Sequence, residues 1–247
     1  MTGGAPMRLT LRQRASWLAH LYKATTQQHH RELTPLFTPY LPAQAIVIDV
    51  GAHAGQFSKL FARLAPDGRV YAFEPSQYAR SILTRALAFN RVGNVTVVPR
   101  GLSDTPAQAV LHTPLKRSSA WGFGTAHLGG AAEGGGHAGE ADQSVSLERL
   151  DDFAAREGLM RLDFIKADVE GWEMRALVGG ERTLRAFHPA LYLEVDGALM
   201  TRAGDTPDAL FAWLAELGYR AFETPSLKPA PAWRGAGDYL FVADEKA

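Results

Sequence analysis

Residues 47–58 read VIDVGAHAGQFS and join an apolar run, a glycine turn and the start of an amphipathic segment. The β-branched run before the turn is typical of a strand that is buried on both faces of a parallel sheet. After the turn, Phe57, Leu60 and Phe61 recur at helical spacing, which predicts a helix over residues 56–64. The stretch therefore predicts a strand, a tight turn and a helix, with the backbone N–H groups of the turn at the edge of the sheet where ligands bind.

Further apolar runs follow at regular intervals, with helical patterns between them. Strands are expected at residues 45–50, 69–74, 95–99, 163–168, 190–195, 218–222 and 238–243, and helices at 76–90, 171–187 and 205–217. Alternating strands and helices predict an α/β fold with a mostly parallel, seven-stranded sheet and helices on both of its faces. Only a loop separates the last two strands, which predicts an antiparallel edge strand.

The composition of the 247 residues excludes several kinds of protein. The chain contains no cysteine, which excludes a disulfide scaffold, a thiolate metal site and a cysteine nucleophile. Lys and Arg number 26, as do Asp and Glu, and this balance argues against a nucleic-acid partner held by phosphate neutralisation. No apolar run reaches the length of about 20 residues that a membrane span needs, and residues 1–23 lack the apolar stretch of a signal peptide. We therefore expect a cytoplasmic protein with no membrane span.

Residues 1–40 form a basic segment in front of a main domain that we expect over residues 41–247. Five Arg and Lys side chains in this segment accompany one Glu. Leu11, Leu18 and Tyr22 fall at helical spacing and predict an amphipathic helix. Two alternatives stay open for it: the helix packs on the main domain, or it serves as a lid or as the contact of a homodimer.

Residues 122–139 are rich in glycine, which carries a high entropy cost of ordering. Apolar runs at 108–112 and 144–147 flank this segment and predict the two strands of a hairpin. We therefore expect an insertion over about residues 113–143. A surface loop and a flap over the site are the two alternatives for it.

Two acids accompany the first two turns of the predicted sheet. Asp49 stands two residues before Gly51, in a turn that lacks the G-x-G-x-x-G pattern of dinucleotide-binding proteins. A carboxylate there would repel a pyrophosphate but suits a ligand with an ammonium group. The alternative is a purely structural role, in which Asp49 braces the turn by hydrogen bonds. Glu74 ends the second strand, where an acid can accept hydrogen bonds from both ribose hydroxyls of an adenosine. Together the two acids predict S-adenosylmethionine, an adenosine with an amino-acid tail.

Six blocks of the chain resemble successive motifs of the FkbM-type methyltransferases. They read VIDVGAHAG, VYAFEPS, NVTVVPRGLSD, SVSLERLDDF, FIKADVEGWEMRALVGG and LYLEVDG, and lie between residue 45 and about residue 197. The resemblance implies a Rossmann-like class I methyltransferase fold and methyl transfer from S-adenosylmethionine, typically to oxygen. It implies cofactor contacts for Asp49, Gly51, Gly55, Glu74, Leu102, Ser103 and Asp168. Ala52, His53, Phe57, Pro75 and Ser76 flank the first two motifs and are expected to line the same site.

Three positions depart from the family pattern. His53 stands where the family commonly has Asn, and Arg100 with Gly101 stand where small residues precede the Leu. These two departures affect contacts to the adenine or to the tail of the cofactor. Asp196 stands where a His is expected, so a base role at that position lacks support in this chain.

A cluster of carboxylates is expected where two neighbouring strands end. Asp168 ends one strand, Glu170 opens the helix after it, and Glu194 and Asp196 end the next strand. Clustered acids raise the pKa of at least one member, so Asp168, Glu170 and Glu194 are the predicted catalytic residues, with a general base among them. The acids could instead hold a divalent cation, which is less favoured because no Asn or His accompanies them. Glu170 and Glu173 could also act only as caps of the helix.

Aromatic and histidine side chains give weaker signals. Trp121, Trp172 and Trp233 could line a pocket for the methyl acceptor, with packing in the core as the alternative. His29 and His30 are expected at the surface, and no histidine spacing indicates a metal site.

The sequence thus favours an S-adenosylmethionine-dependent O-methyltransferase that acts on a hydroxyl of a small molecule or glycan. A nicotinamide-dependent oxidoreductase and a non-catalytic protein that binds an adenosine cofactor are the alternatives. The missing G-x-G-x-x-G pattern weighs against the oxidoreductase. The presence of Asp49, Glu74 and Asp168 weighs against the non-catalytic protein.

Overall fold

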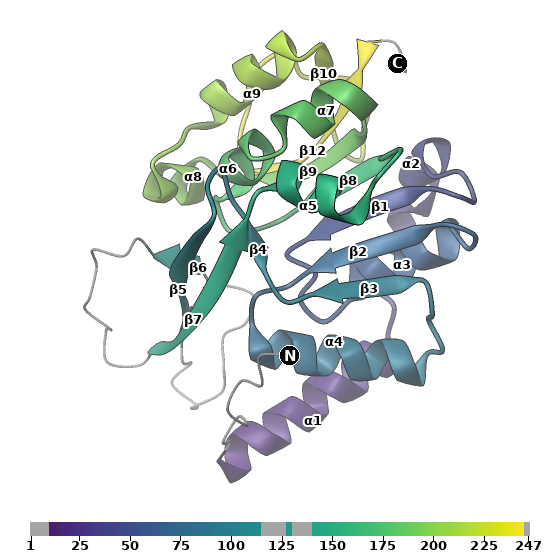
Figure 1. Ribbon diagram of the computed structural model, residues 1–247, viewed down its shortest axis with the longest axis vertical. Helices are drawn as coiled ribbons and strands as arrows, with labels where there is room; N and C mark the ends of the chain where they lie inside the picture. The colour runs from purple at the N-terminus through teal and green to yellow at the C-terminus, as the bar shows by residue number, and fades with distance from the viewer. Residues whose placement is uncertain (1–9, 115–126, 130–139, 245–247) are drawn as a thin grey trace.

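A computed structural model describes residues 10–114, 127–129 and 140–244, and shows an α/β architecture (Figure 1). The main sheet has the strand order β11-β10-β12-β9-β8-β1-β2-β3. Its strands are β1 (Ile46–Val50), β2 (Arg69–Phe73), β3 (Val95–Val98), β8 (Phe164–Ala167), β9 (Ala190–Val195), β10 (Tyr219–Glu223), β11 (Lys228–Pro229) and β12 (Gly237–Ala243). The five neighbouring strands from β9 to β3 are parallel, which confirms the predicted mostly parallel sheet.

The antiparallel strands lie at one side of this sheet, as predicted. β12 runs antiparallel between β9 and β10, and β11 pairs antiparallel with β10 at the edge. The sheet has one strand more than the seven expected. The extra strand is the two-residue β11, which is too short to leave a periodic signal in the sequence.

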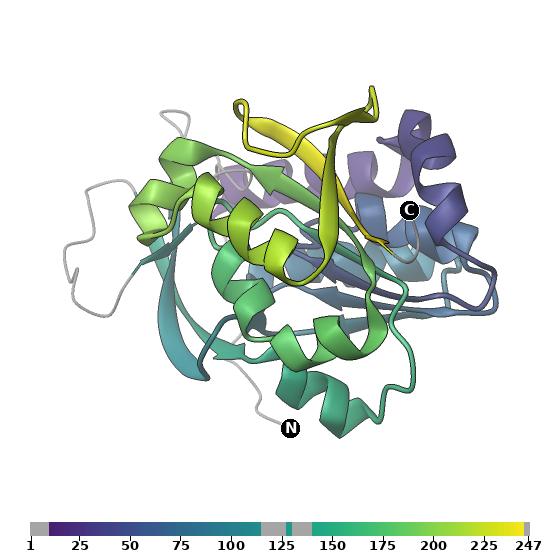
Figure 2. The same cartoon turned by 90° about the horizontal axis from the view of Figure 1, so that it is seen from above.

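Alternate side chains of the strands enter two separate cores on the two faces of the sheet. Along β1, Val47 packs with α2 and α3, whereas Ile48 packs with α5, α6, α7 and α9. The helices are α1 (Leu11–Thr26), α2 (Thr34–Phe37), α3 (Gln56–Leu64), α4 (Gln77–Phe89), α5 (Leu150–Glu157), α6 (Glu173–Val178), α7 (Glu181–Phe187), α8 (Gly197–Ala203) and α9 (Pro207–Glu216), with short 3₁₀ turns at Arg31–Leu33 and Thr38–Tyr40. Figure 2 shows the amino-terminal helices (purple and blue) and the carboxyl-terminal helices (green) on opposite sides of the sheet.

A second sheet stands at the side toward which β1, β2 and β3 point (Figure 1). It has the order β4-β7-β5-β6, formed by β4 (Gly101–Leu102), β5 (Ala107–Pro114), β6 (His127–Gly129) and β7 (Glu140–Glu148). β5 and β7 pair antiparallel, which confirms the predicted hairpin. Most of the predicted glycine-rich insertion, including Trp121, lies outside the described residues.

Helix α1 lies outside α4 as an additional layer (Figure 1). Its contacts come from Trp17, Leu21 and Ala24, and the Trp17 indole N–H donates to Ser81 Oγ at 2.8 Å. The apolar stripe that predicts this helix does not make the contact, because Leu11, Leu18 and Tyr22 are exposed. The helix therefore has two apolar stripes, and the one beginning at Trp17 packs against the protein.

A candidate active site at the carboxyl ends of the strands

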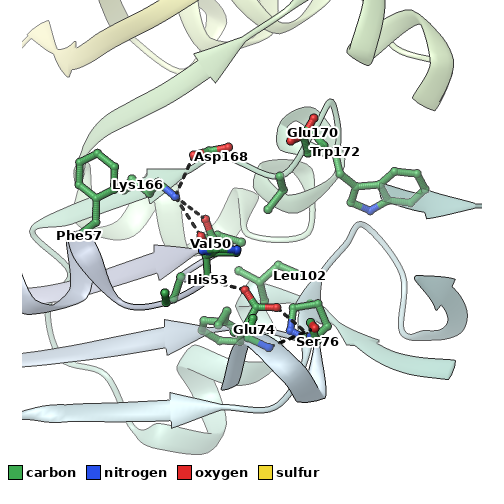
Figure 3. Close-up of a pocket in the computed structure, with 18 of the residues that line it drawn as sticks. Val50, His53, Phe57, Glu74, Ser76, Leu102, Lys166, Asp168, Glu170 and Trp172 are labelled. Atoms are coloured by element: carbon green, nitrogen blue, oxygen red, sulfur yellow. Dashed lines mark hydrogen bonds and ion pairs between the residues drawn. The ribbon is translucent and has the colours of Figure 1, made fainter. Parts of the chain in front are cut away.

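A cavity of about 290 Å³ lies where β1, β2 and β8 end (Figure 3). Most of the predicted cofactor residues line it: Gly51, Ala52, His53, Phe57, Glu74, Pro75, Ser76, Leu102 and Asp168. Glu170 and Trp172 line it as well, from the turn that follows β8. The cavity has roughly the size at which small-molecule sites begin. The structure thus brings together residues from four separate motifs of the sequence.

The glycine turn after β1 is fixed by its neighbours. Gly51 has a φ of 75°, and its N–H and that of Ala52 both donate to the carbonyl of Phe73 at 3.0 Å. A Cβ atom on Gly51 would lie 2.1 Å from the backbone oxygen of Asp168. Glycine is therefore required at position 51 for two reasons. The chain after β8 packs directly against it, and its positive φ is a conformation that other residues rarely adopt.

Glu74 is buried at the wall of the cavity, with 6% of its surface exposed. Its Oε2 atom accepts a hydrogen bond from the His53 N–H at 2.7 Å, and its Oε1 atom accepts one from the Ser76 N–H at 2.8 Å. Burial raises the pKa of Glu74 to about 7. Each carboxylate oxygen can accept a further hydrogen bond, so Glu74 can bind a pair of neighbouring hydroxyls. His53 has a φ of 48°, a conformation that Asn and His adopt more readily than most residues, which fits the Asn of the family pattern.

Lys166 is a site residue that the sequence reasoning missed. It is 2% exposed, and its Nζ atom donates to the carbonyls of Gly51 at 3.2 Å and Val50 at 3.3 Å (Figure 3). Nζ also lies 3.5 Å from Asp168 Oδ2 and 3.6 Å from Asp49 Oδ1. Burial lowers the pKa of Lys166, but the two carboxylates outweigh it and the net shift is upward. The signal available in the sequence was a charged residue inside an otherwise apolar strand.

Asp49 is fully buried and does not line the cavity. Its Oδ2 atom accepts a hydrogen bond from Ser58 Oγ at 2.5 Å. Its Oδ1 atom forms an ion pair with Lys166 Nζ at 3.6 Å. Burial raises the pKa of Asp49, while Lys166 and Ser58 act in the opposite direction. In this structure Asp49 partners a buried cation of the protein, so its predicted contact with a ligand ammonium would require Lys166 to move.

Gly55 and Ser103 also stand behind the lining residues. Gly55 precedes α3 with a φ of 82°, and a Cβ there would meet a methyl group of Leu83 at 2.3 Å. Ser103 Oγ accepts a hydrogen bond from the Trp172 indole N–H at 3.3 Å and so supports a residue of the wall. Direct contact of Asp49, Gly55 or Ser103 with a cofactor stays a prediction.

The predicted acidic cluster has two members with opposed pKa shifts. Lys166 lowers the pKa of Asp168, whose side chain is 44% exposed toward the cavity. Burial, together with the neighbouring Asp168, raises the pKa of Glu194 to about 8. At neutral pH these opposed shifts keep Asp168 ionised and leave the proton on Glu194. Glu194 is not among the residues that line the cavity.

Glu170 and Asp196 have different surroundings from each other. Glu170 lines the cavity on a turn with a φ of 56°, and burial followed by the charge of Asp168 raises its pKa. Asp196 caps α8, because its Oδ1 atom accepts from the N–H groups of Ala198 and Leu199 at 2.8 and 3.1 Å. The cap accounts for Asp196 without a catalytic role.

Glu173 holds the turn that carries Glu170. It is 1% exposed, and its Oε1 atom accepts from the N–H groups of Val169 at 2.8 Å and Gly171 at 3.3 Å. Burial raises its pKa to about 7. The second Glu of the DVEGWE block thus braces the turn, while the first one reaches the cavity.

Of the tryptophan and histidine residues considered above, some line the cavity and others lie away from it. Trp172 lines the cavity, whereas Trp233 packs against Gly197 away from it. His29 is exposed, but His30 lines the cavity and stacks on Phe57 with ring centroids 4.2 Å apart. The expectation of a surface position for His30 is wrong, because the segment after α1 folds back over the start of α3.

The described part of the chain contains neither a metal-binding cluster nor a membrane-spanning helix. Within residues 10–114, 127–129 and 140–244, no three His, Asp or Glu side chains are grouped so that they could bind a metal ion. In the same residues, no helix has the length and apolar character to cross a membrane.

Known proteins resemble this chain in sequence and in fold. The sequence model of the methyltransferase FkbM domain family matches residues 49–221 of this chain. Methyltransferase sdnD of Sordaria araneosa is 28% identical over 160 residues, which are 56% of this chain and 61% of that protein. The 2-O-methyltransferase NoeI of Sinorhizobium fredii is 25% identical over 164 residues, 63% of this chain and 64% of that protein. The chain thus spans less than two thirds of the length of each relative.

A solved structure extends the likeness to the whole fold. The crystal structure of methyltransferase FkbM from Methylobacillus flagellatus superposes with a TM-score of 0.50 at 14% sequence identity. The match covers 94% of this chain and 59% of that chain. At this identity it supports the predicted class I methyltransferase fold and nothing about substrates.

Proposed function

Since this chain belongs to the FkbM methyltransferase family, we propose that it transfers a methyl group from S-adenosylmethionine to a hydroxyl oxygen of a small molecule or glycan. The observation that carries the proposal is Glu74, a buried carboxylate whose two oxygens are aligned by backbone N–H groups at the cavity wall. The relative NoeI is a 2-O-methyltransferase, which supports oxygen as the acceptor atom.

The residues of the cavity fit the parts of this cofactor. Glu74 can accept hydrogen bonds from the two ribose hydroxyls, and Pro75 and Leu102 offer apolar surface to the adenine. At the other side, Lys166 and Asp168 present a cation and an anion 3.5 Å apart. Such a pair suits the carboxylate and the ammonium of a zwitterionic amino-acid tail. When bound, S-adenosylmethionine supplies a methyl group on a positively charged sulfur.

The acidic residues then have separate tasks. Glu170 lines the cavity with a raised pKa, which makes it a stronger base than an ordinary Glu and suits it to accept the proton of the acceptor hydroxyl. Asp168 stays ionised beside Lys166 and fixes charge next to the reacting groups. Glu194, protonated at neutral pH, supports the ionised form of Asp168 through a side-chain hydrogen bond. Methyl transfer is an in-line displacement, so alignment by the cavity wall contributes as much as the base does.

The proposed base works without a metal ion. Lys166 already places a positive charge 3.5 Å from Asp168 and so opposes a divalent cation at the same carboxylate. The opposite version, a metal-assisted site, would lose turnover with a chelator and regain it with magnesium. A metal-free site would keep its turnover in the presence of the chelator.

A mass-shift screen tests the proposed activity. The protein is incubated with S-adenosylmethionine and a library of hydroxylated small molecules and glycans, and products that gain one methyl group are sought by mass spectrometry. The Asp168→Asn variant is the control, with S-adenosylhomocysteine binding measured in parallel. Methylated products from the unmodified protein alone support the proposal. Products methylated only on nitrogen, or oxidation of NADH by the protein, contradict it.

A further inference from the structure

Helices α1 and α4 form a pair at the outer side of the protein. Trp17, Leu21 and Ala24 of α1 pack against α4, and at the far end Asn90 Nδ2 donates to the Thr25 carbonyl at 3.1 Å. α1 is the outermost layer of the two, and in Figure 1 no described element covers its outer side. The contact with α4 holds the helix in place, and among the described residues none covers its second face.

That outer face carries an apolar stripe. Leu11, Leu18 and Tyr22 are 83%, 59% and 66% exposed. At 100° per residue they lie within about 40° of one another around the helix. Phe89, the last residue of α4, is 71% exposed. Of the large hydrophobic side chains that the described residues expose, most therefore gather on this one helix pair, which marks an interaction surface.

The charge of the same helix pair has one sign. Its exposed cations are Arg12, Arg14 and Lys23 on α1 and Arg85 on α4, and neither helix contains an Asp or Glu. Arg80 of α4 is half-buried instead, and donates to the carbonyls of Glu74 and Pro75. The whole chain has a net charge of zero, so the positive charge is segregated here. On the helical wheel, Arg14 falls on one flank of the stripe and Arg12 and Lys23 fall on the other. An apolar stripe with cations on both of its flanks is the pattern of a helix that lies in the interface of a membrane.

We propose that the outer face of α1 docks on an anionic phospholipid surface. The stripe enters the boundary between headgroups and acyl chains, and the flanking cations pair with lipid phosphates. A second copy of the chain is a poorer occupant, because a symmetric α1–α1 contact would bring together only positive charges. The docking is peripheral and does not involve a membrane-spanning helix.

Vesicle cosedimentation tests the proposal. We expect the protein to bind phosphatidylcholine vesicles that contain phosphatidylglycerol, to bind vesicles of phosphatidylcholine alone much more weakly, and to dissociate at high salt. Leu18→Ser with Tyr22→Ser should weaken binding at least about tenfold, since both side chains lose their buried apolar area. Arg12→Gln, Arg14→Gln and Lys23→Gln should each weaken it about fivefold.

Met160→Ser is the matched control. Met160 is 90% exposed but lies between α5 and β8, away from α1, so its variant should bind as the unmodified protein does. All changed positions are exposed, and an unchanged melting temperature verifies the fold of each variant. Absence of binding to the anionic vesicles, or full binding by the Leu18→Ser, Tyr22→Ser variant, overturns the proposal. A dimer in sedimentation velocity that this variant abolishes, without any vesicle binding, would assign the face to a second copy instead.

Discussion

Replacing Glu74 with Ala removes both acceptors that we assign to the ribose. The carboxylate is 6% exposed and already accepts the N–H groups of His53 and Ser76, so its position in the cavity wall is fixed before a ligand binds. Without it, the ribose hydroxyls of the bound cofactor would lose their partners at the cavity wall. An unpaired buried polar group costs about 1–3 kcal/mol, which corresponds to a roughly 5- to 150-fold rise in Kd.

Isothermal titration calorimetry with S-adenosylhomocysteine measures this loss directly. Asp151→Ala is the matched control, because Asp151 is also buried, at 3% exposed, and accepts hydrogen bonds from the N–H and the hydroxyl of Thr183. Asp151 does not line the cavity, so its loss should lower the melting temperature without changing the Kd. An unchanged Kd in Glu74→Ala, or an equal rise in Asp151→Ala, would refute the ribose assignment.

Three further outcomes are expected from single substitutions. Gly51→Ala should lower the free energy of unfolding in urea by about 2–5 kcal/mol, through its positive φ and the contact with the Asp168 oxygen, whereas Gly93→Ala, whose Cβ would meet nothing within 4 Å, should change it little. Glu170→Gln should lower turnover on an identified acceptor about 10²- to 10⁴-fold with cofactor affinity unchanged, and a loss below threefold would leave Glu170 without a base role. Glu173 has a folded pKa of about 7, above the ordinary 4.5, so the folded state keeps a proton that the unfolded chain releases, and stability falls as pH rises from about 4.5 to 7. Glu173→Gln should flatten that slope in urea titrations at pH 5 and pH 8, and an unchanged slope would argue against the burial effect.

The main sheet was predictable because four of its five parallel strands, β1, β2, β8 and β9, are buried on both faces. That burial leaves short apolar runs such as residues 46–50, and the turns after them carry the glycine and proline that end a strand. Ser76 could be identified as the start of α4 for a similar local reason, since its hydroxyl accepts from the Ala79 N–H. Neighbouring residues in the sequence were sufficient to predict these strands and the start of this helix.

Features that depend on contacts between distant segments were not predictable. The choice between the two stripes of α1 is made by α4, which Trp17 meets far along the chain. Lys166 reads as a charge inside an apolar strand, and only the fold shows Asp49 and Asp168 on either side of it. His30 enters the cavity because its segment folds back onto Phe57, and nothing in the HH pair indicates that path.

The central claim is that the cavity beside Glu74 binds an S-adenosyl cofactor. Calorimetric titration of the unmodified protein with S-adenosylhomocysteine, repeated in the presence of excess NADH, tests it most directly. We predict saturable binding at one site per chain, with an affinity that NADH does not change. Binding of NADH in competition with S-adenosylhomocysteine, or no heat from S-adenosylhomocysteine at all, would contradict the claim.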